Sequence, residues 1–259
     1  MKRFASAATP FACLLVLSLT VSASPAAPVP AAPVAAAVPA IVEHAVAAYE
    51  AEVRGAIGMM RHFTTGIQAG PVRHSETSVS GVLLSDGAFS KIKYYQVTQD
   101  GKAFDAQKLA QRDSQTNTDW AAGKIFFKEP YDRRFTGDYQ FEVSTSCTDC
   151  PAGTVDVAFT SAIRDAQHGN GTMLIESSSG RVQKLTYSPN AFPPHANSGT
   201  VTETSGGSSG IWYVTRIDES YRGHELILTG TGTFTGTFDQ FRRFPSVTDG
   251  DAALGNGTI

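Results

Sequence analysis

The chain has 259 residues, of which 21 are Lys or Arg, 24 are Asp or Glu and 41% are hydrophobic. Its formal charge of −3, with no dense cluster of basic residues, argues against a nucleic-acid-binding surface, which needs grouped Lys and Arg to contact phosphates. The length is sufficient for one sizeable β-rich domain.

The N-terminus has the pattern of an export signal. Lys2 and Arg3 precede an apolar run from Phe11 to Val21, and a small-x-small sequence ends at Ala23. The run is shorter than the roughly 20 residues that span a bilayer. We therefore expect a signal peptide over residues 1–23 and a periplasmic or secreted mature protein without a membrane span.

A spacer and a helix follow the signal. Residues 24–40 are almost entirely Ala, Pro and Val, and their prolines exclude a continuous helix, so this segment is predicted to be a linker. From Val42 to Phe63, apolar residues recur at steps of three and four, whereas charged residues such as Arg61 occupy the other positions. This pattern predicts one long amphipathic helix that begins a single domain over residues 41–244.

After Phe63 the apolar period changes from that of a helix to that of a strand, and turn sequences separate the runs. About ten strands are predicted in total. They lie near Phe63–Ala69, Thr77–Leu84, Phe89–Thr98, Phe135–Ser146, Val155–Ser161, Thr172–Ser177, Arg181–Ser188, Thr200–Thr204, Ile211–Tyr221 and Glu225–Phe241.

One insert interrupts the strands, over residues 102–130. Asp105 has the character of an N-cap for a short helix through Arg112. A bulky apolar segment follows, and its residues Trp120, Phe126 and Phe127 are candidates for a gate over a binding site.

The last strand shows nearly uninterrupted alternation. Apolar residues and glycines, from Leu228 to Phe238, share one face, and threonines share the other. Glycines on the apolar face permit a long strand to bend. The predicted fold is mainly β with α (α+β): a strongly curved antiparallel sheet or unclosed β-barrel, packed on the N-terminal helix and the short inserted helix. Residues 245–259 are polar and are predicted to form a disordered tail.

Cys147 and Cys150 are the cysteines that remain after signal cleavage. They lie between two alternating runs, at the predicted tip of a hairpin, where the Cα separation across a tight turn suits a disulfide. A structural disulfide is the preferred interpretation in an oxidising compartment, and a redox centre or half of a metal site are the alternatives.

Motifs for catalysis are weak. Ser208 satisfies the GxSxG pattern of a nucleophile elbow, but a strand pattern follows it where the elbow requires a helix. Asp165 and His168 are close enough in sequence to form an acid/base pair, yet their turn-like context favours surface polarity. We predict no catalytic residue, no metal site and no cofactor, and expect the protein not to be an enzyme.

The element order of signal, leading helix, strands, helical insert and strands resembles the LolA/LolB-like family of bacterial envelope proteins. In that family an unclosed β-barrel wraps around helices and holds acyl chains between sheet and helix. The resemblance covers roughly residues 39–244 and implies a carrier or sensor for an acyl chain, a lipid or a lipidated protein.

Under this hypothesis five residues are candidates for lining a cavity: Phe141, Phe159, Trp212, Leu228 and Phe234. The same alternation would also result from a filled core. A second hypothesis is therefore an envelope protein–protein interaction module without a lipid cavity. A third is an envelope hydrolase or thiol oxidoreductase.

Overall fold

The structure is a computed structural model that describes residues 37–124, 127–144, 150–192, 196–225 and 228–259. The predicted signal peptide and nearly all of the predicted linker lie outside these residues, so both stay predictions. Within the described ranges the elements are α1 (Ala40–Glu52), β1 (Ala56–Ala69), β2 (Val72–Ser85), β3 (Ala88–Gln99), β4 (Lys102–Ala103), α2 (Ala106–Ala121), the 3-10 helix η1 (Thr136–Asp138), β5 (Gln140–Val143), β6 (Thr154–Thr160), β7 (Gly169–Glu176), β8 (Val182–Pro189), β9 (Ser198–Ser208), β10 (Ile211–Glu225), β11 (Leu228–Phe244) and α3 (Val247–Asn256).

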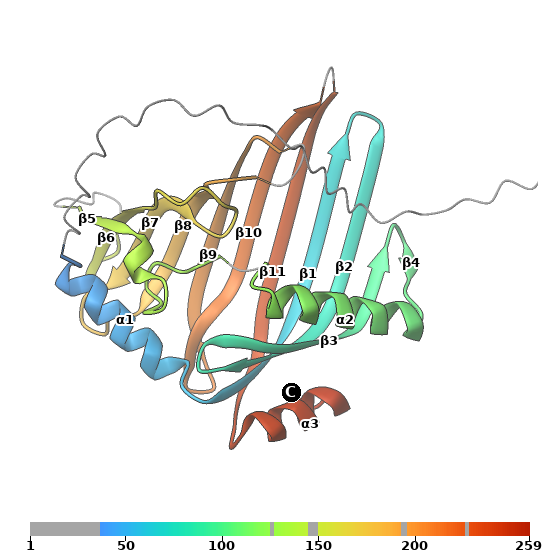
Figure 1. Cartoon of the computed structure of the whole chain (residues 1–259), viewed down its shortest axis with the longest axis horizontal. Helices are drawn as coiled ribbons and strands as arrows, with labels where there is room; N and C mark the ends of the chain where they lie inside the picture. Colours follow the sequence, from blue (N-terminus) through green and yellow to red (C-terminus); the bar gives the residue numbers. More distant parts are fainter. Residues whose placement is uncertain (1–36, 125–126, 145–149, 193–195, 226–227) are drawn as a thin grey trace, which may run out of the picture. The chain divides into compact units, whose positions relative to one another are not determined.

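The described strands form one antiparallel sheet in the order β4-β3-β2-β1-β11-β10-β9-β8-β7-β6-β5. Neighbours in the sheet are neighbours in sequence except at the centre, where β1 pairs with β11. Strands β4 and β5 form the two edges, so the sheet curves without closing into a barrel (Figure 1). The predicted fold class is confirmed, and each predicted strand overlaps an observed one.

Helix α1 is shorter than the sequence pattern predicts. The predicted helix continues to Phe63, whereas α1 ends at Glu52 and β1 begins at Ala56. Gly55, between them, has a φ of +80°, and its N–H donates to the Asp86 side chain at 2.8 Å, which fixes a turn. The later apolar residues belong to β1, where pairing with β2 and β11 satisfies both edges of the strand.

Two helices cover one face of the sheet, which we call the inner face. Val42 and Val46 of α1 pack into a core cluster with side chains of β6–β9, and Trp120 of α2 packs into a second cluster with side chains of β1–β3. Asp105 caps α2 as predicted, because its side chain accepts from the Lys108 N–H at 2.9 Å. The helix continues beyond the predicted end to Ala121.

The third helix corrects the predicted disordered tail. α3 begins after Ser246, whose hydroxyl accepts from the Asp249 N–H at 3.1 Å, and ends at Gly257 in the left-handed region. Its Leu254 is 1% exposed and packs with Leu83, whose neighbours in β2 face inward, so α3 covers the outer face. The polar composition concealed the helix because few of its side chains are buried.

We expect Leu254→Ala to lower the free energy of unfolding by about 3 kcal/mol, because it leaves a cavity beneath α3. Urea unfolding measures the change, and Ala252→Ser on the exposed side of α3 is the matched control, with an effect within about 0.5 kcal/mol. Equal stability of the Leu254 variant and the wild type would show that α3 does not contribute to the core.

Candidate functional site

Strand register assembles the inner face from residues that are distant in sequence. Directly paired residues of adjacent strands share a face, so one row crosses the sheet from β8 to β2. The row consists of Leu185, Glu203, Ile217, Gly236, Phe63 and Ser78. This register brings one residue from each of six strands into a single row that includes an acidic, a glycine and an aromatic position.

An uncovered apolar surface occupies the inner face of the central strands. It consists of Phe63, Ile67, Val72, Tyr221 and Phe234, which register and alternation place on that face, and we call it the open strip. Ile67 and Val72 are each 51% exposed, and the other three are half-buried. Figure 1 shows the central strands extending beyond α1 and α2, so none of the described helices lies over this part of the face.

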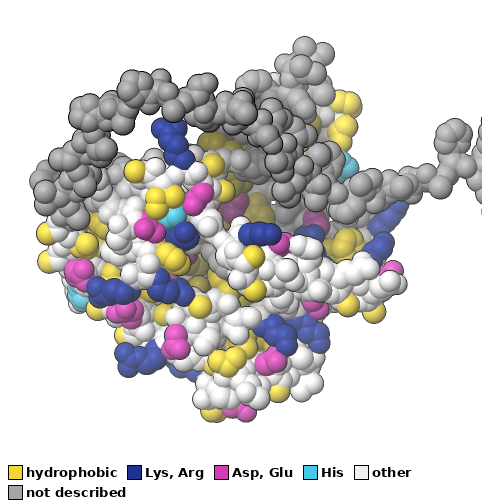
Figure 2. Space-filling model, viewed as in Figure 1, with side chains coloured by type: hydrophobic (Ala, Val, Ile, Leu, Met, Phe, Trp, Pro, Cys, Tyr) yellow, Lys and Arg dark blue, Asp and Glu magenta, His cyan; other side chains and the backbone are white. Residues whose placement is uncertain are grey.

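Glycines form the floor of the open strip along β11. Gly230, Gly232 and Gly236 alternate with outward-facing threonines, as predicted. A Cβ at Gly236 would lie 2.2 Å from the Phe63 ring, whereas a Cβ at Gly232 would meet only the Tyr221 Cβ at 3.9 Å. The strand therefore presents bare backbone beside Phe234. Figure 2 shows a hollow between the half that carries α1 and the half that carries α2, with hydrophobic side chains inside it.

Buried carboxyl groups lie on the β9–β10 side of the strip. Glu203 is 5% exposed, accepts from the Tyr187 hydroxyl at 3.4 Å through Oε1, and has no hydrogen-bond partner for Oε2 among the described residues. Burial, followed by repulsion from Glu219, raises the pKa of Glu203 to about 7. Burial also raises the pKa of Glu219, and burial followed by repulsion from Glu203 raises that of Glu129. Glu129 and Glu203 therefore stay protonated at pH values at which an ordinary carboxyl group has lost its proton.

The segment over residues 127–139 covers the α1 half of the inner face. The ring of Phe127 stacks on that of Tyr187 with 3.6 Å between centroids. The Lys128 N–H donates to the Gln167 carbonyl at 2.8 Å, and the Tyr139 hydroxyl donates to the Lys128 carbonyl. These contacts attach the segment to β8 and to the loop between β6 and β7, and the Tyr139 hydrogen bond joins its two ends.

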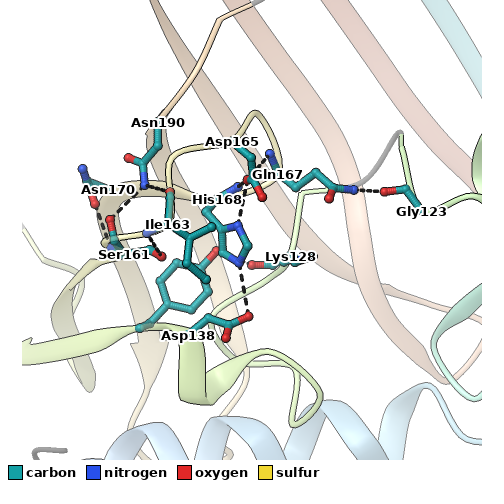
Figure 3. A network of polar contacts seen from close by, with 11 residues as sticks. Gly123, Lys128, Asp138, Ser161, Ile163, Asp165, Gln167, His168, Asn170 and Asn190 are labelled. Atoms are coloured by element: carbon teal, nitrogen blue, oxygen red, sulfur yellow. Dashed lines mark hydrogen bonds and ion pairs between the residues drawn. The ribbon is translucent and has the colours of Figure 1, made fainter. Parts of the chain in front are cut away.

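His168 is the centre of this attachment (Figure 3). The ring is fully buried, with Nδ1 at 2.7 Å from Asp165 Oδ1 and Nε2 at 3.2 Å from Asp138 Oδ2. Asp165 also accepts from the backbone N–H groups of Gln167 and His168. The expectation of surface polarity is wrong for His168, because the turn folds inward and joins the β6–β7 loop to η1.

The candidate gate and cavity residues do not converge on one site. Trp120 and Phe159 are buried in separate core clusters, and Phe141 packs at the border of the cluster that contains Phe159. Phe127 lies beside that cluster as well. Phe234 lies in the open strip, with its ring 4.3 Å from that of Phe63.

The remaining candidates lie elsewhere or are not described. Trp212 is half-buried near the end of α1, where its indole N–H donates to the Val182 carbonyl at 3.1 Å and it lines a small pocket with Tyr49 and Glu52. Leu228 begins β11, but its side chain lies outside the described residues, as does the whole of Phe126. The cavity and gate roles stay predictions.

The paired cysteines also stay a prediction, because Cys147 lies outside the described residues. The structure confirms the flanking hairpin: β5 and β6 are antiparallel, with Phe141 opposite Phe159. Ser208 ends β9 and a turn leads directly into β10, so the strand-to-helix elbow that nucleophilic Ser208 would need is not formed there.

Neither a metal-binding cluster nor a membrane-spanning helix is found in the described ranges. No group of three or more His, Cys, Asp or Glu side chains in these ranges is arranged to hold a metal ion. None of the helices there combines the length and the apolar character needed to traverse a bilayer.

Sequence reasoning missed three residues of the site: Arg61, Phe63 and Glu203. Arg61 was placed on the polar face of a helix, whereas it lies in β1, 8% exposed, with its guanidinium carbon 4.1 Å from the Phe63 ring centroid. Arg61 lies two residues before Phe63, and residues two apart in a strand share a face. A strand assignment for this segment would therefore have placed Arg61 beside Phe63. Glu203 carries the same kind of signal, because it follows the inward Val201 by two residues.

No family model matches the chain, and no curated protein sequence matches it. Solved structures that are similar include a LolA superfamily protein from Nitrosomonas europaea, with 15% identity, 83% of this chain and 95% of that chain covered, and a TM-score of 0.34. A DUF1329 family protein from Desulfovibrio piger has 10% identity, the same coverage of both chains and a TM-score of 0.38. A domain described as an outer membrane lipoprotein-sorting protein, from Vibrio parahaemolyticus, has 8% identity, covers 83% of this chain and 98% of its own, and has a TM-score of 0.41. The first of these belongs to the LolA superfamily, which the element order resembles.

The raised pKa of Glu203 predicts a stability that falls with rising pH. The folded state holds the proton up to about pH 7, whereas the ordinary value is 4.5, so the wild type loses stability between these values. We expect Glu203→Gln to match the wild type near about pH 4 and to exceed its free energy of unfolding by on the order of 2–3 kcal/mol at about pH 8.

Urea unfolding at both pH values tests this, with the exposed Glu142→Gln as control, for which the difference from wild type does not change with pH. A Glu203→Gln difference that is also independent of pH would contradict the assignment.

Replacing His168 tests its role as an anchor. His168→Ala is expected to lower the free energy of unfolding by about 3 kcal/mol, because it leaves a cavity and two carboxylates without their shared partner. Hydrogen exchange at the Lys128 amide should accelerate, because the attachment of its segment is lost. The control is His74→Ala, an exposed histidine at 3.0 Å from Asp100, for which we expect a change within about 0.5 kcal/mol. Unchanged exchange at Lys128 in His168→Ala would remove the anchoring role.

Proposed function

We propose that this chain is a non-catalytic binding protein of the cell envelope, and that its inner face holds the acyl chain of a lipid or of a lipidated protein. The single observation that carries the proposal is the open strip. Ile67 and Val72 are half exposed on the same face as the packed core, where no described helix covers them. The export signal expected over residues 1–23 supports an envelope location.

The shape of the strip suits a narrow, flexible apolar ligand. Gly230 and Gly232 leave a path without side chains along β11, which we call the channel, and the rings of Phe234 and Tyr221 lie beside it. Each methylene group that an acyl chain buries there contributes about 0.8 kcal/mol. A long chain could therefore bind through apolar burial alone, without a reactive group in the protein.

The polar groups beside the open strip favour a binding function over a catalytic one. The polar groups that flank it, Glu203 and Glu219, are hydrogen-bonded to the hydroxyl groups of Tyr187 and Tyr221 respectively. A hydrolase would need an activated nucleophile beside them, and the Ser208 pattern lies at the β9–β10 turn instead. These contacts suit a binding surface with buried polar borders.

Gly232→Leu tests the proposal, because it fills the channel while its Cβ has open space in the fold. We expect the affinity for a fluorescent fatty acid to fall by about tenfold, since the new side chain displaces the acyl chain from β11. Thr233→Leu, on the outer face of the same strand, is the matched control and should bind like the wild type.

Fluorescence titration of the mature protein measures both variants. Wild-type protein that binds no fatty acid, or equal loss in the two variants, would contradict an acyl-binding strip. In the first case, co-purification of an intact partner protein would favour the interaction module.

A further inference from the structure

The buried end of the open strip carries a cation without an acidic partner. We infer that the guanidinium of Arg61 binds the anionic group, a carboxylate or a phosphate, of the ligand whose acyl chain lies on the strip. This inference rests on the proposed function and names the chemistry of the ligand's polar end.

Neutral groups hold Arg61 in place. Its Nε donates to the Ser80 hydroxyl at 3.0 Å, and its Nη2 donates to the Tyr94 hydroxyl at 3.0 Å. Ser80 and Tyr94 come from β2 and β3, so three adjacent strands fix the guanidinium on the inner face. A side chain ordered in this way keeps its planar fork in one orientation before a ligand arrives.

The charge of Arg61 is not compensated within the described part of the chain. No described carboxylate lies within ion-pair distance of it, and Glu76, on the inner face of β2, is already paired with Arg112 at 2.6 Å. Burial lowers the pKa of the guanidinium, yet an arginine stays protonated in proteins. Two of its five N–H donors are in use in hydrogen bonds to Ser80 and Tyr94, and Nη1 donates to no described group.

Aromatic rings connect the guanidinium to the open strip. Its carbon lies 4.1 Å from the centroid of Phe63 and 5.9 Å from that of Trp120, and Phe63 in turn contacts Phe234. An acyl chain in the channel along β11 would thus end beside a fixed cation in an apolar surrounding. The other side of the strip carries the acidic side chains of Glu203 and Glu219, and neither of them can pair with an anion as Arg61 can, so the site favours one orientation of the ligand.

A guanidinium is well suited to this role. Its parallel N–H groups match the spacing of carboxylate and phosphate oxygens, and hydrogen bonds between charged groups are about twice as strong as those between neutral groups. A ligand with the same chain and a neutral end would gain the apolar contacts only.

The test compares three probes with one chain length: hexadecanoate, hexadecyl phosphate and hexadecanol. Displacement of a fluorescent fatty acid from the mature wild-type protein gives their affinities. We expect at least one of the two anions to bind about tenfold or more tightly than hexadecanol. The tighter anion shows whether the natural group is a carboxylate or a phosphate.

Arg61→Met supplies the second arm, because it keeps an apolar side chain of similar length at this position. It should reduce the affinity for the anions to that for hexadecanol and leave hexadecanol binding unchanged. The control is Arg216→Met on the outer face of β10, where Arg216 is paired with Asp218, and it should keep the wild-type preference.

The outcomes separate the two proposals. If the wild type binds all three probes equally, the role of Arg61 is overturned while acyl binding stands. If it binds none of them, acyl binding itself fails. If Arg61→Met does not fold, the wild-type preference among the three probes still decides the inference.

Discussion

The pairing of β1 with β11 is the constraint on which the rest of the structure depends. It joins the two halves of the meander, and its register decides which side chains of the central strands face inward. A slip of β11 by one residue would turn Phe234 outward and the threonines of β11 inward, onto the face that carries Phe63. Gly236 secures the register from within, because any side chain there would collide with the Phe63 ring. The open strip, its glycine floor and the position of Arg61 all follow from this one register.

The strands were predictable because their signal is local. Alternation and turn sequences located every long strand, and the uninterrupted pattern of β11 indicated both its inner face and its glycines. Helix ends were less predictable. The apolar residues of α1 and β1 follow the same helical spacing of three and four residues across Gly55. The two elements are separated by the turn that the Asp86 side chain fixes. α3 escaped prediction because a single residue, Leu254, supplies its largest buried side chain.

The candidate site was predictable only in part, because burial of a charge is decided by distant neighbours. Arg61 and Glu203 are charged residues, and residues of these types usually lie on the protein surface. Arg61 is buried because Ser80, Tyr94 and Trp120 come from other elements to surround it, and Glu203 because Tyr187 and the segment 127–139 lie over that half of the inner face. The aromatic residues chosen from sequence were inward-facing in strands, yet alternation cannot tell a packed core from an uncovered strip.

The two parts of the inner face differ in how they are covered: the segment 127–139 lies over the α1 half, and the open strip lies on the central strands. His168 holds the segment 127–139 over the α1 half, where Phe127 stacks on Tyr187 and Glu203 is buried. No described helix covers the open strip on the central strands, where Ile67 and Val72 stay half exposed. Unpaired charges are costly in an interior, and a chain that only needed stability would replace Arg61 by an apolar residue of similar volume. The buried cation beside the open strip is therefore the feature that the proposed anionic ligand would neutralise.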